Sequence, residues 1–271
     1  MKPIRILVPT DFSTCAANAL KSAVHIAKHL NAKITLFHVK EEMILQEGSR
    51  SHFNEPVLND ELKSRFKEFV EPVRDIRQLS YDQMARIGDV EEQIAELAEE
   101  IDAEVIIMGT KGSSGIYEVL MGSNTYAVVR SSKIPVLVIP SGSEINEIHH
   151  IALAGDYKPI QPEMLEPVKL FAGIDGADIH IVHVDDNGNL TEKEKEAAMK
   201  FNRYLKNHRH HYHLIIGDDV EESLNSYCIN KNIDVIAMIP RKHKLFDRVF
   251  DGGETKSMVF HTNIPLLTIP E

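Results

Sequence analysis

The sequence predicts an α/β protein made of two tandem, doubly wound domains, each with a five-stranded parallel sheet. Three observations support this fold class. The 271-residue chain contains one pattern twice, short apolar runs alternate with amphipathic helical segments, and the composition is 43% hydrophobic and 26% charged. These fractions are typical of globular proteins, and the length allows two domains of about 100–150 residues each.

The repeat is visible by direct alignment. Residues 89–140 match residues 219–270 without a gap, at a constant offset of 130. Farther upstream the offset becomes 145, because the first copy has a longer connection between Val39 and Asp89. A repeat of this length indicates a tandem duplication. We therefore expect one domain over residues 1–142 and a second over residues 146–271.

Each copy alternates strand and helix signals. β-branched, apolar runs without polar alternation are typical of parallel strands that are covered on both faces. In the first copy these runs are Ile4–Val8, Ile34–Val39, Val105–Met108 and Val136–Ile139. Residues 16–30 carry an apolar helical face, and Asp89 followed by Glu92 resembles a capping box before the next helix. In such a sheet a ligand binds beyond the carboxyl ends of the strands, where the strand order reverses.

A glycine-rich stretch lies at that edge. Gly109 and Gly112 follow an apolar strand, and Gly122 and Ser123 open the next helix. Glycines let a backbone approach a phosphate closely, and a helix N-terminus offers unpaired N–H donors. Ser123 either caps the helix or donates its hydroxyl to a phosphate, and Lys111 places a positive charge nearby. The alternative is that the glycines only make turns. No Walker A spacing is present.

Two further positions face the same edge. Asp11 follows the first strand, where a carboxylate can accept hydrogen bonds from a ribose or an adenine amine; it can equally be a helix cap. Val39 ends the second strand and can offer backbone groups to a base. Cys15 lies on the first predicted helix, near this edge, and we interpret it as a packed thiol.

These residues resemble the universal stress protein family, in the tandem arrangement of two such domains. The resemblance implies a Rossmann-like fold of the adenine nucleotide alpha hydrolase type, ATP or AMP that copurifies, and domains that pair through their last strands, Val136–Ile139 and Leu266–Ile269, as a pseudo-dimer. It implies that Asp11 and Val39 contact the nucleoside and that Gly109, Gly112, Gly122, Ser123 and Asn124 hold the phosphates. The whole predicted nucleotide site is Pro9, Thr10, Asp11, Val39, Met108, Gly109, Lys111, Gly112, Gly122, Ser123, Asn124 and Thr125.

The second copy departs from this motif. At the offset of 130, Gly109 becomes Ile239, Gly112 becomes Lys242 and Ser123 becomes Gly253, whereas Gly122 is retained as Gly252. Pro240 also removes an N–H donor. We therefore predict that only the first domain binds ATP.

Charge and composition limit the remaining functions. The net charge of −11 argues against nonspecific nucleic-acid binding. No apolar run reaches the roughly 20 residues that span a bilayer, and we expect a cytoplasmic protein with no membrane partner. One short segment contains four histidines, His208, His210, His211 and His213. If the segment is a strand, alternation places His211 and His213 on one face, which allows them to bind a transition metal. The alternative is an exposed polar stretch that precedes a strand. Arg241, Lys242, Lys244 and Arg248 form a basic cluster, on either an anion-binding or a solvated loop.

The leading hypothesis is a regulatory, nucleotide-binding stress protein. Its ligand is ATP, with AMP and ADP as alternatives and Mg²⁺ as an optional companion, and its protein partners are unknown. The alternatives are a slow ATP hydrolase and a nucleotide-independent scaffold or small-molecule binder that uses the second domain. We assign no catalytic residue and no metal ligand, and a homodimer of tandem chains is also allowed. The amphipathic stretch Leu58–Val73 either covers a site or lengthens a helix.

Overall fold

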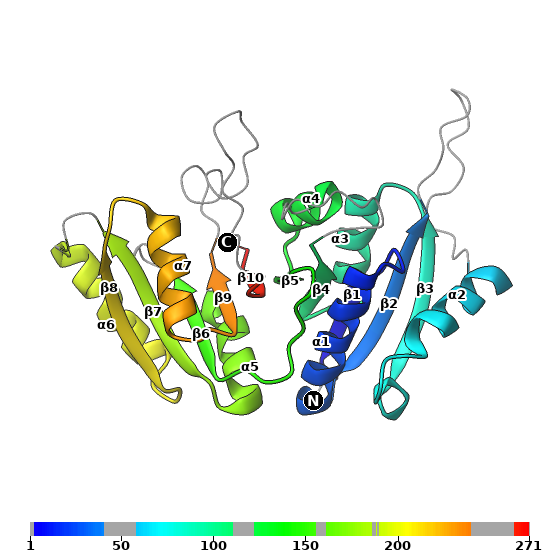
Figure 1. Cartoon of the computed structure of the whole chain (residues 1–271), viewed down its shortest axis with the longest axis horizontal. Helices are drawn as coiled ribbons and strands as arrows, with labels where there is room; N and C mark the ends of the chain where they lie inside the picture. Colours follow the sequence, from blue (N-terminus) through cyan, green and yellow to red (C-terminus); the bar gives the residue numbers. More distant parts are fainter. Residues whose placement is uncertain are drawn as a thin grey trace, which may run out of the picture. The chain divides into compact units, whose positions relative to one another are not determined.

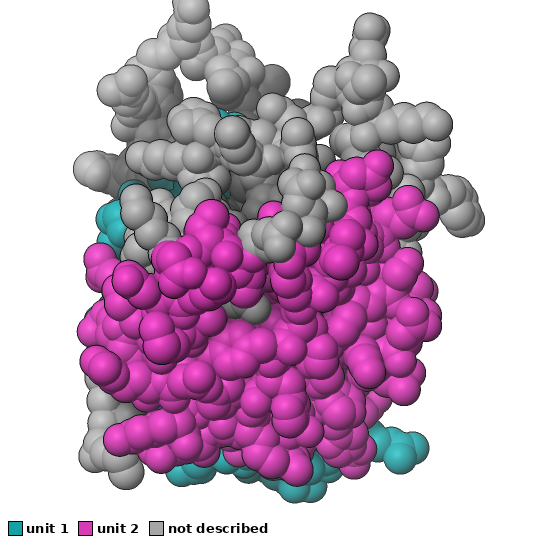
Figure 2. Space-filling model, turned by 90° about the vertical axis from the view of Figure 1, so that its left-hand side faces the viewer, with its two compact units in different colours: residues 1–144 teal, residues 145–271 magenta. Residues whose placement is uncertain are grey.

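The computed structural model describes residues 3–40, 58–110, 122–155, 161–185, 188, 190–239 and 263–270. The chain divides into two compact units, residues 1–144 (unit 1) and residues 145–271 (unit 2), which Figure 2 colours separately. No helix within the described ranges is long and apolar enough to cross a membrane.

Unit 1 is a doubly wound α/β domain. Its elements are β1 (Arg5–Pro9), α1 (Thr14–Leu30), β2 (Lys33–Lys40), α2 (Asp60–Val70), a 3-10 turn (Ile76–Gln78), β3 (Tyr81–Ile87), α3 (Val90–Glu100), β4 (Val105–Gly109), α4 (Ser123–Ser131) and β5 (Val136–Ile139). The strands run parallel in the order β3-β2-β1-β4-β5, and helices lie on both faces of the sheet (Figure 1). The predicted fold class is confirmed.

The local sequence explains where the helices begin and end. The Ser13 side chain accepts a hydrogen bond from the backbone N–H of Ala16 and caps α1, and Asn31 ends the helix in the left-handed conformation. Asp89 caps α3 by accepting from the N–H of Glu92, which is the first half of the predicted capping box. The apolar face of α1, including Ala19, Ala23 and Ile26, is fully buried.

The core of unit 1 lies on both sides of its central strands. Every residue of β5, and every residue of β4 except Gly109, is buried. Continuous burial without alternation is what a parallel sheet covered by helices on both faces requires. The strands of unit 1 therefore match the sequence prediction closely, with ends that differ by one residue.

Unit 2 repeats the same strand order. Its elements are β6 (His150–Ala154), a 3-10 turn (Pro162–Leu165), α5 (Glu166–Asp175), β7 (Asp178–Asp185), α6 (Glu192–Tyr204), β8 (His210–Ile216), α7 (Val220–Asn230), β9 (Val235–Met238) and β10 (Leu266–Thr268). The parallel order β8-β7-β6-β9-β10 corresponds strand by strand to that of unit 1. The bounds of β6 and β7 follow those of β1 and β2 at the predicted offset of 145.

The two copies differ in their first helix. α1 begins at Thr14, and the corresponding position at the offset of 145 is residue 159. In unit 2 the 3-10 turn spans Pro162–Leu165, and α5 begins only at Glu166. Both helices end at equivalent residues, Leu30 and Asp175. The helix that follows the first strand is thus shorter at its N-terminal end in unit 2, which is the end nearest to the edge where the predicted site lies.

Candidate functional site

The candidate site of unit 1 lies where the strand order reverses. β1 pairs with β2 on one side and with β4 on the other, so the loops that follow β1 and β4 leave from adjacent strand ends. Pro9 and Gly109 are the last residues of these two strands. This carboxyl edge is the usual ligand position in doubly wound sheets.

The loop after β1 is held by short-range hydrogen bonds. The N–H of Thr10 donates to the carbonyl of Phe37 (2.8 Å), and the N–H of Ser13 donates to the Asp11 carboxylate (3.0 Å). Asp11 therefore stabilises the turn before the helix, whereas the N-cap of α1 is Ser13, so the capping interpretation of Asp11 is wrong. A carboxylate oxygen accepts more than one hydrogen bond, so this contact is compatible with a nucleoside-binding role for half-buried Asp11.

Phe12 is the unusual residue of this loop. Its φ of 66° lies in the left-handed region, which costs about 1–2 kcal/mol for a side chain of this type. The Phe12 N–H donates to the Thr10 hydroxyl, and its ring packs edge-on against Phe66 and Phe69 of α2, at centroid distances of 5.1 and 5.6 Å. The Arg65 guanidinium lies 4.2 Å from the same ring centroid. α2 therefore packs against this loop.

His38 connects β2 to the same loop. Its Nδ1 lies 2.8 Å from the carbonyl oxygen of Thr10, and its ring contacts that of Phe12 at 4.7 Å. Burial lowers the pKa of His38, so the neutral ring donates its Nδ1–H to Thr10. Sequence reasoning missed His38 and Phe12, because no spacing rule links a strand residue to a loop residue on a neighbouring strand.

The backbone N–H and C=O of Val39 lie near the end of β1. The carbonyl of Phe37 accepts from Thr10, and in a strand the backbone groups of residue i+2 point to the same side as those of residue i. β1 ends at Pro9, which is the register partner of Phe37. The N–H and C=O of Val39 therefore face the space beyond β1, as the predicted contact with a base requires.

The start of α4 is attached to the end of β4. The N–H of Gly122 donates to the carbonyl of Thr110 (2.5 Å), and the Thr125 hydroxyl donates to the carbonyl of Gly109 (2.9 Å). Thr125 is buried, so its role is to position the helix. Gly122 is the N-cap and makes no side-chain cap bond. The expectation that Ser123 caps the helix is therefore wrong, because Ser123 already lies in its first turn.

The N-terminus of α4 is suited to an anion. Ser123 and Asn124 are exposed, and no acidic residue lies in the first turn. By contrast, α3 carries its Asp89 cap together with Glu91 and Glu92 at the same position. Unpaired N–H groups and the helix dipole favour negative charge at an uncapped N-terminus.

Gly109 has a packing role that is independent of any ligand. A Cβ at this position would lie 2.7 Å from the Cys15 sulfur and 2.9 Å from the Cys15 carbonyl carbon and oxygen. Only glycine allows α1 to approach β4 this closely. Cys15 itself is buried, with its Sγ 3.8 Å from the Ile139 carbonyl oxygen, in agreement with a packed thiol.

Several predicted positions lie outside the described residues. These are Lys111, Gly112, Pro240, Lys242, Gly252, Gly253 and the remainder of the basic cluster. Of the four histidines, His208 precedes β8 and the other three lie within it. The expectation of a polar stretch before the strand is therefore wrong for His210, His211 and His213.

The fold and this edge define a doubly wound α/β protein with a helix N-terminus at the switch point of its first unit. The model of the universal stress protein family matches residues 4–140. The chain belongs to the universal stress protein family. The predicted pairing of the two units through their last strands stays a prediction.

Individual relatives agree with this assignment. A universal stress protein of Methanocaldococcus jannaschii is 31% identical over 153 residues, which cover 50% of this chain and 93% of the relative. The universal stress protein YxiE of Bacillus subtilis is 28% identical over 144 residues, or 50% of this chain and 97% of YxiE. The crystal structure of a universal stress protein from Archaeoglobus fulgidus matches with a TM-score of 0.67 at 18% identity, and covers 98% of this chain and 96% of that chain. At 18% identity, the match to the Archaeoglobus fulgidus structure shows the fold alone, which consists of two tandem domains.

Proposed function

We propose that unit 1 binds one adenine nucleotide, ATP in the first instance, and that its occupancy regulates association with protein partners in the cytoplasm. The observation that carries this proposal is the attachment of α4 to β4. The bonds from Gly122 to Thr110 and from Thr125 to Gly109 hold the N-terminus of α4, whose N-cap Gly122 makes no side-chain cap bond, at the switch point. This end carries exposed Ser123 and Asn124 and no acidic side chain, which suits a phosphate tail.

The nucleoside end of the ligand is assigned to the loop after β1 and to β2. Asp11 follows the end of β1 and Val39 lies near the end of the neighbouring strand β2, where they suit the ribose and the base respectively. Phe12 and His38 hold this loop in place. The proposal thus uses hydrogen-bonding groups from three strand ends, and the glycine pattern of the sequence supplies the remaining phosphate contacts.

We propose that unit 2 does not bind ATP in this manner. Ile239 follows β9 where unit 1 has Gly109, and α5 begins later than α1. Both differences lie at the edge that corresponds to the candidate site. We therefore expect one nucleotide per chain.

Calorimetric titration of the full chain with ATP tests the proposal. We expect one site, and binding that weakens in the order ATP, AMP, adenosine, because each step removes phosphate contacts. Ser123→Ala removes one hydroxyl donor at the phosphate end and should weaken ATP binding by roughly 5–30-fold, or about 1–2 kcal/mol. Ser131→Ala, in the last turn of the same helix, is the matched control and should leave the affinity unchanged. Two equivalent sites, or no binding at millimolar ATP, would refute it.

A further inference from the structure

Four histidines gather on one face of the unit 2 sheet. They are His150 of β6, His180 of β7, and His211 and His213 of β8, and we call them the histidine cluster. His180 pairs in register with Ala152 on one side and with His211 on the other. Because side chains alternate along a strand, all four rings project from the same face. The predicted placement of His211 and His213 on one face is confirmed.

The rings are close enough to interact directly. The Nδ1 of His150 lies 3.2 Å from the Nε2 of His180. The His213 ring stacks on the His180 ring, with centroids 5.2 Å apart and an interplanar angle of 17°, and the His211 ring lies 6.3 Å away. His180 is therefore the central member, in contact with histidines from both neighbouring strands.

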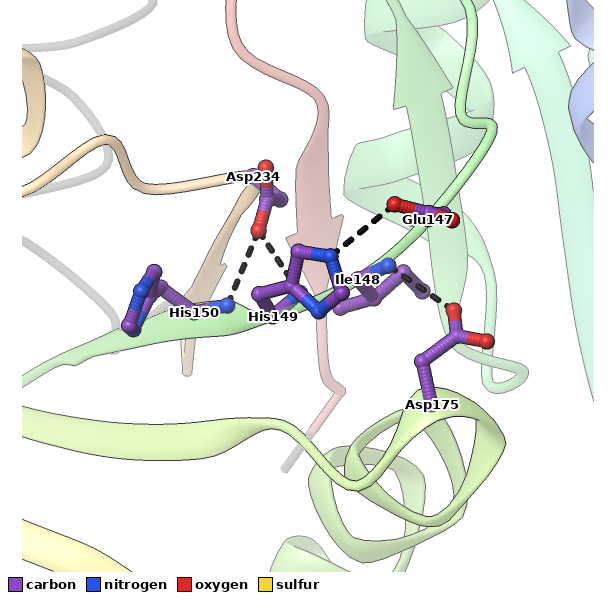
Figure 3. A network of polar contacts seen from close by, with 6 residues as sticks. All are labelled: Glu147, Ile148, His149, His150, Asp175 and Asp234. Carbon is purple, nitrogen blue, oxygen red and sulfur yellow. Dashed lines mark hydrogen bonds and ion pairs between the residues drawn. The ribbon is translucent and has the colours of Figure 1, made fainter.

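The backbone at His150 is fixed by a carboxylate network. Asp234 accepts hydrogen bonds from the N–H groups of His149 (2.7 Å) and His150 (2.9 Å), and Asp175 accepts from that of Ile148 (2.8 Å). Figure 3 shows these contacts, with the His150 ring turned away from Glu147 and His149. The network leaves the imidazole of His150 available to His180.

Tyr227 of α7 orients the central ring. Its hydroxyl lies 2.7 Å from the Nδ1 of His180. When His180 donates its Nδ1–H to this oxygen, Nε2 keeps its lone pair toward His150. An outer hydrogen bond of this kind fixes the tautomer of metal-binding histidines.

One nitrogen of the cluster is buried without a partner. The Nε2 of His213 is buried without a hydrogen-bond partner, and such an atom normally has a partner in a folded protein.

We propose that the histidine cluster binds a divalent transition-metal ion such as Zn²⁺ through His150, His180 and His213. Two nitrogens that bind one tetrahedral ion at about 2.0–2.1 Å lie about 3.3 Å apart, which matches the spacing of His150 and His180. Binding by His213 requires a rotation of its side chain, after which its unpartnered Nε2 would be the third ligand. Imidazole suits Zn²⁺, Cu²⁺ and Ni²⁺, and a water or exposed His211 completes the coordination.

The cluster is specific to the second copy. The positions that correspond to it in the strand registers of unit 1 are Arg5, Thr35, Asp82 and Met84. None of these is a histidine, so the inference goes beyond the nucleotide site of unit 1 and does not depend on it.

Metal titration of the full, tag-free chain tests this proposal. His25 and His29 lie one turn apart on α1, with ring centroids 4.5 Å apart, and can chelate ions on their own. All measurements therefore use a His25→Gln/His29→Gln background. Zn²⁺ is titrated against a chromophoric chelator, and Co²⁺ is followed by the visible absorption of its tetrahedral complexes. We expect one ion per chain and an affinity reduced at least 10-fold by His150→Gln, His180→Gln or His213→Gln. Tyr227→Phe should weaken binding by about 10–100-fold.

His210→Gln is the matched control. His210 lies on the opposite face of β8, where its ring contacts Asn202, and its loss should leave the affinity unchanged. If circular dichroism shows that the variant of buried His180, His180→Gln, does not fold, the affinities of His150→Gln and His213→Gln decide the test. Absence of Zn²⁺ binding in the background chain, or an affinity that is the same in the histidine variants as in the His210→Gln control, would overturn the proposal.

Discussion

The Thr125 hydroxyl donates to the carbonyl oxygen of Gly109 across 2.9 Å, and so attaches the first turn of α4 to the last residue of β4. α1 also approaches Gly109 so closely that a Cβ there would lie 2.7 Å from the Cys15 sulfur. One residue therefore connects the strand to both helices that border the candidate site.

Thr125→Val keeps the shape of the side chain but removes the hydroxyl. We expect the free energy of unfolding to fall by about 1–2 kcal/mol, because the Gly109 carbonyl loses its donor. ATP binding should weaken in parallel as α4 loses its attachment. Urea denaturation and calorimetry measure the two effects. Ser123→Ala should reduce affinity alone, and an identical stability loss in both variants would contradict the assigned roles.

Gly109→Ala should destabilise unit 1 by about 1–3 kcal/mol, because the new Cβ overlaps Cys15. The contacts at 2.9 Å involve the backbone of Cys15, so adding Cys15→Ala should restore only part of the loss. Gly173→Ala is the control. It lies in α5 with nothing within 4 Å of the new Cβ, and should stabilise the chain by about 0.5–1 kcal/mol. Equal effects of the two alanines in thermal unfolding would argue against the packing explanation.

Phe12 combines an unfavourable φ with favourable ring contacts. Phe12→Ala loses the contacts and keeps the backbone cost, whereas Phe12→Gly loses the contacts and removes that cost. We therefore expect Phe12→Gly to be more stable than Phe12→Ala by about 1 kcal/mol, the reverse of their order at an ordinary position. Chemical denaturation of the two variants measures the difference, and the ordinary order would show that the left-handed conformation is not maintained in solution.

His38 should make the stability of unit 1 depend on pH. Its folded-state pKa lies below the ordinary value of 6.5, mainly through burial; Arg65 and Lys40 add to the shift, while the Thr10 carbonyl and Asp11 oppose it. Between the two pKa values the unfolded chain binds more protons, so the free energy of unfolding decreases as pH falls below 6.5. His38→Gln should make this decrease shallower between pH 7 and pH 5. Exposed His29→Gln serves as the control, and equal slopes for the two variants would contradict the assignment.

Much of the fold was predictable because it depends on periodicity. The positions of four strands in the first copy and the two-fold repeat follow from apolar runs such as Val105–Met108 and from the constant offsets. The contacts of the site were less predictable, since they join residues on different elements. No local signal pairs His38 with Thr10, or His180 with His150. Ser123 shows a third limit, because helix ends shift by a residue according to the path of the preceding loop.

The repeated strand register has a practical consequence for protein engineering. The two units have the same strand register, and they differ in the side chains that the strands carry. Arg5, Thr35, Asp82 and Met84 mark where imidazoles could be transplanted into the first half of the chain. The molecule thus contains its own acceptor scaffold, in which the chemistry of one copy can be moved to the other without redesigning a backbone.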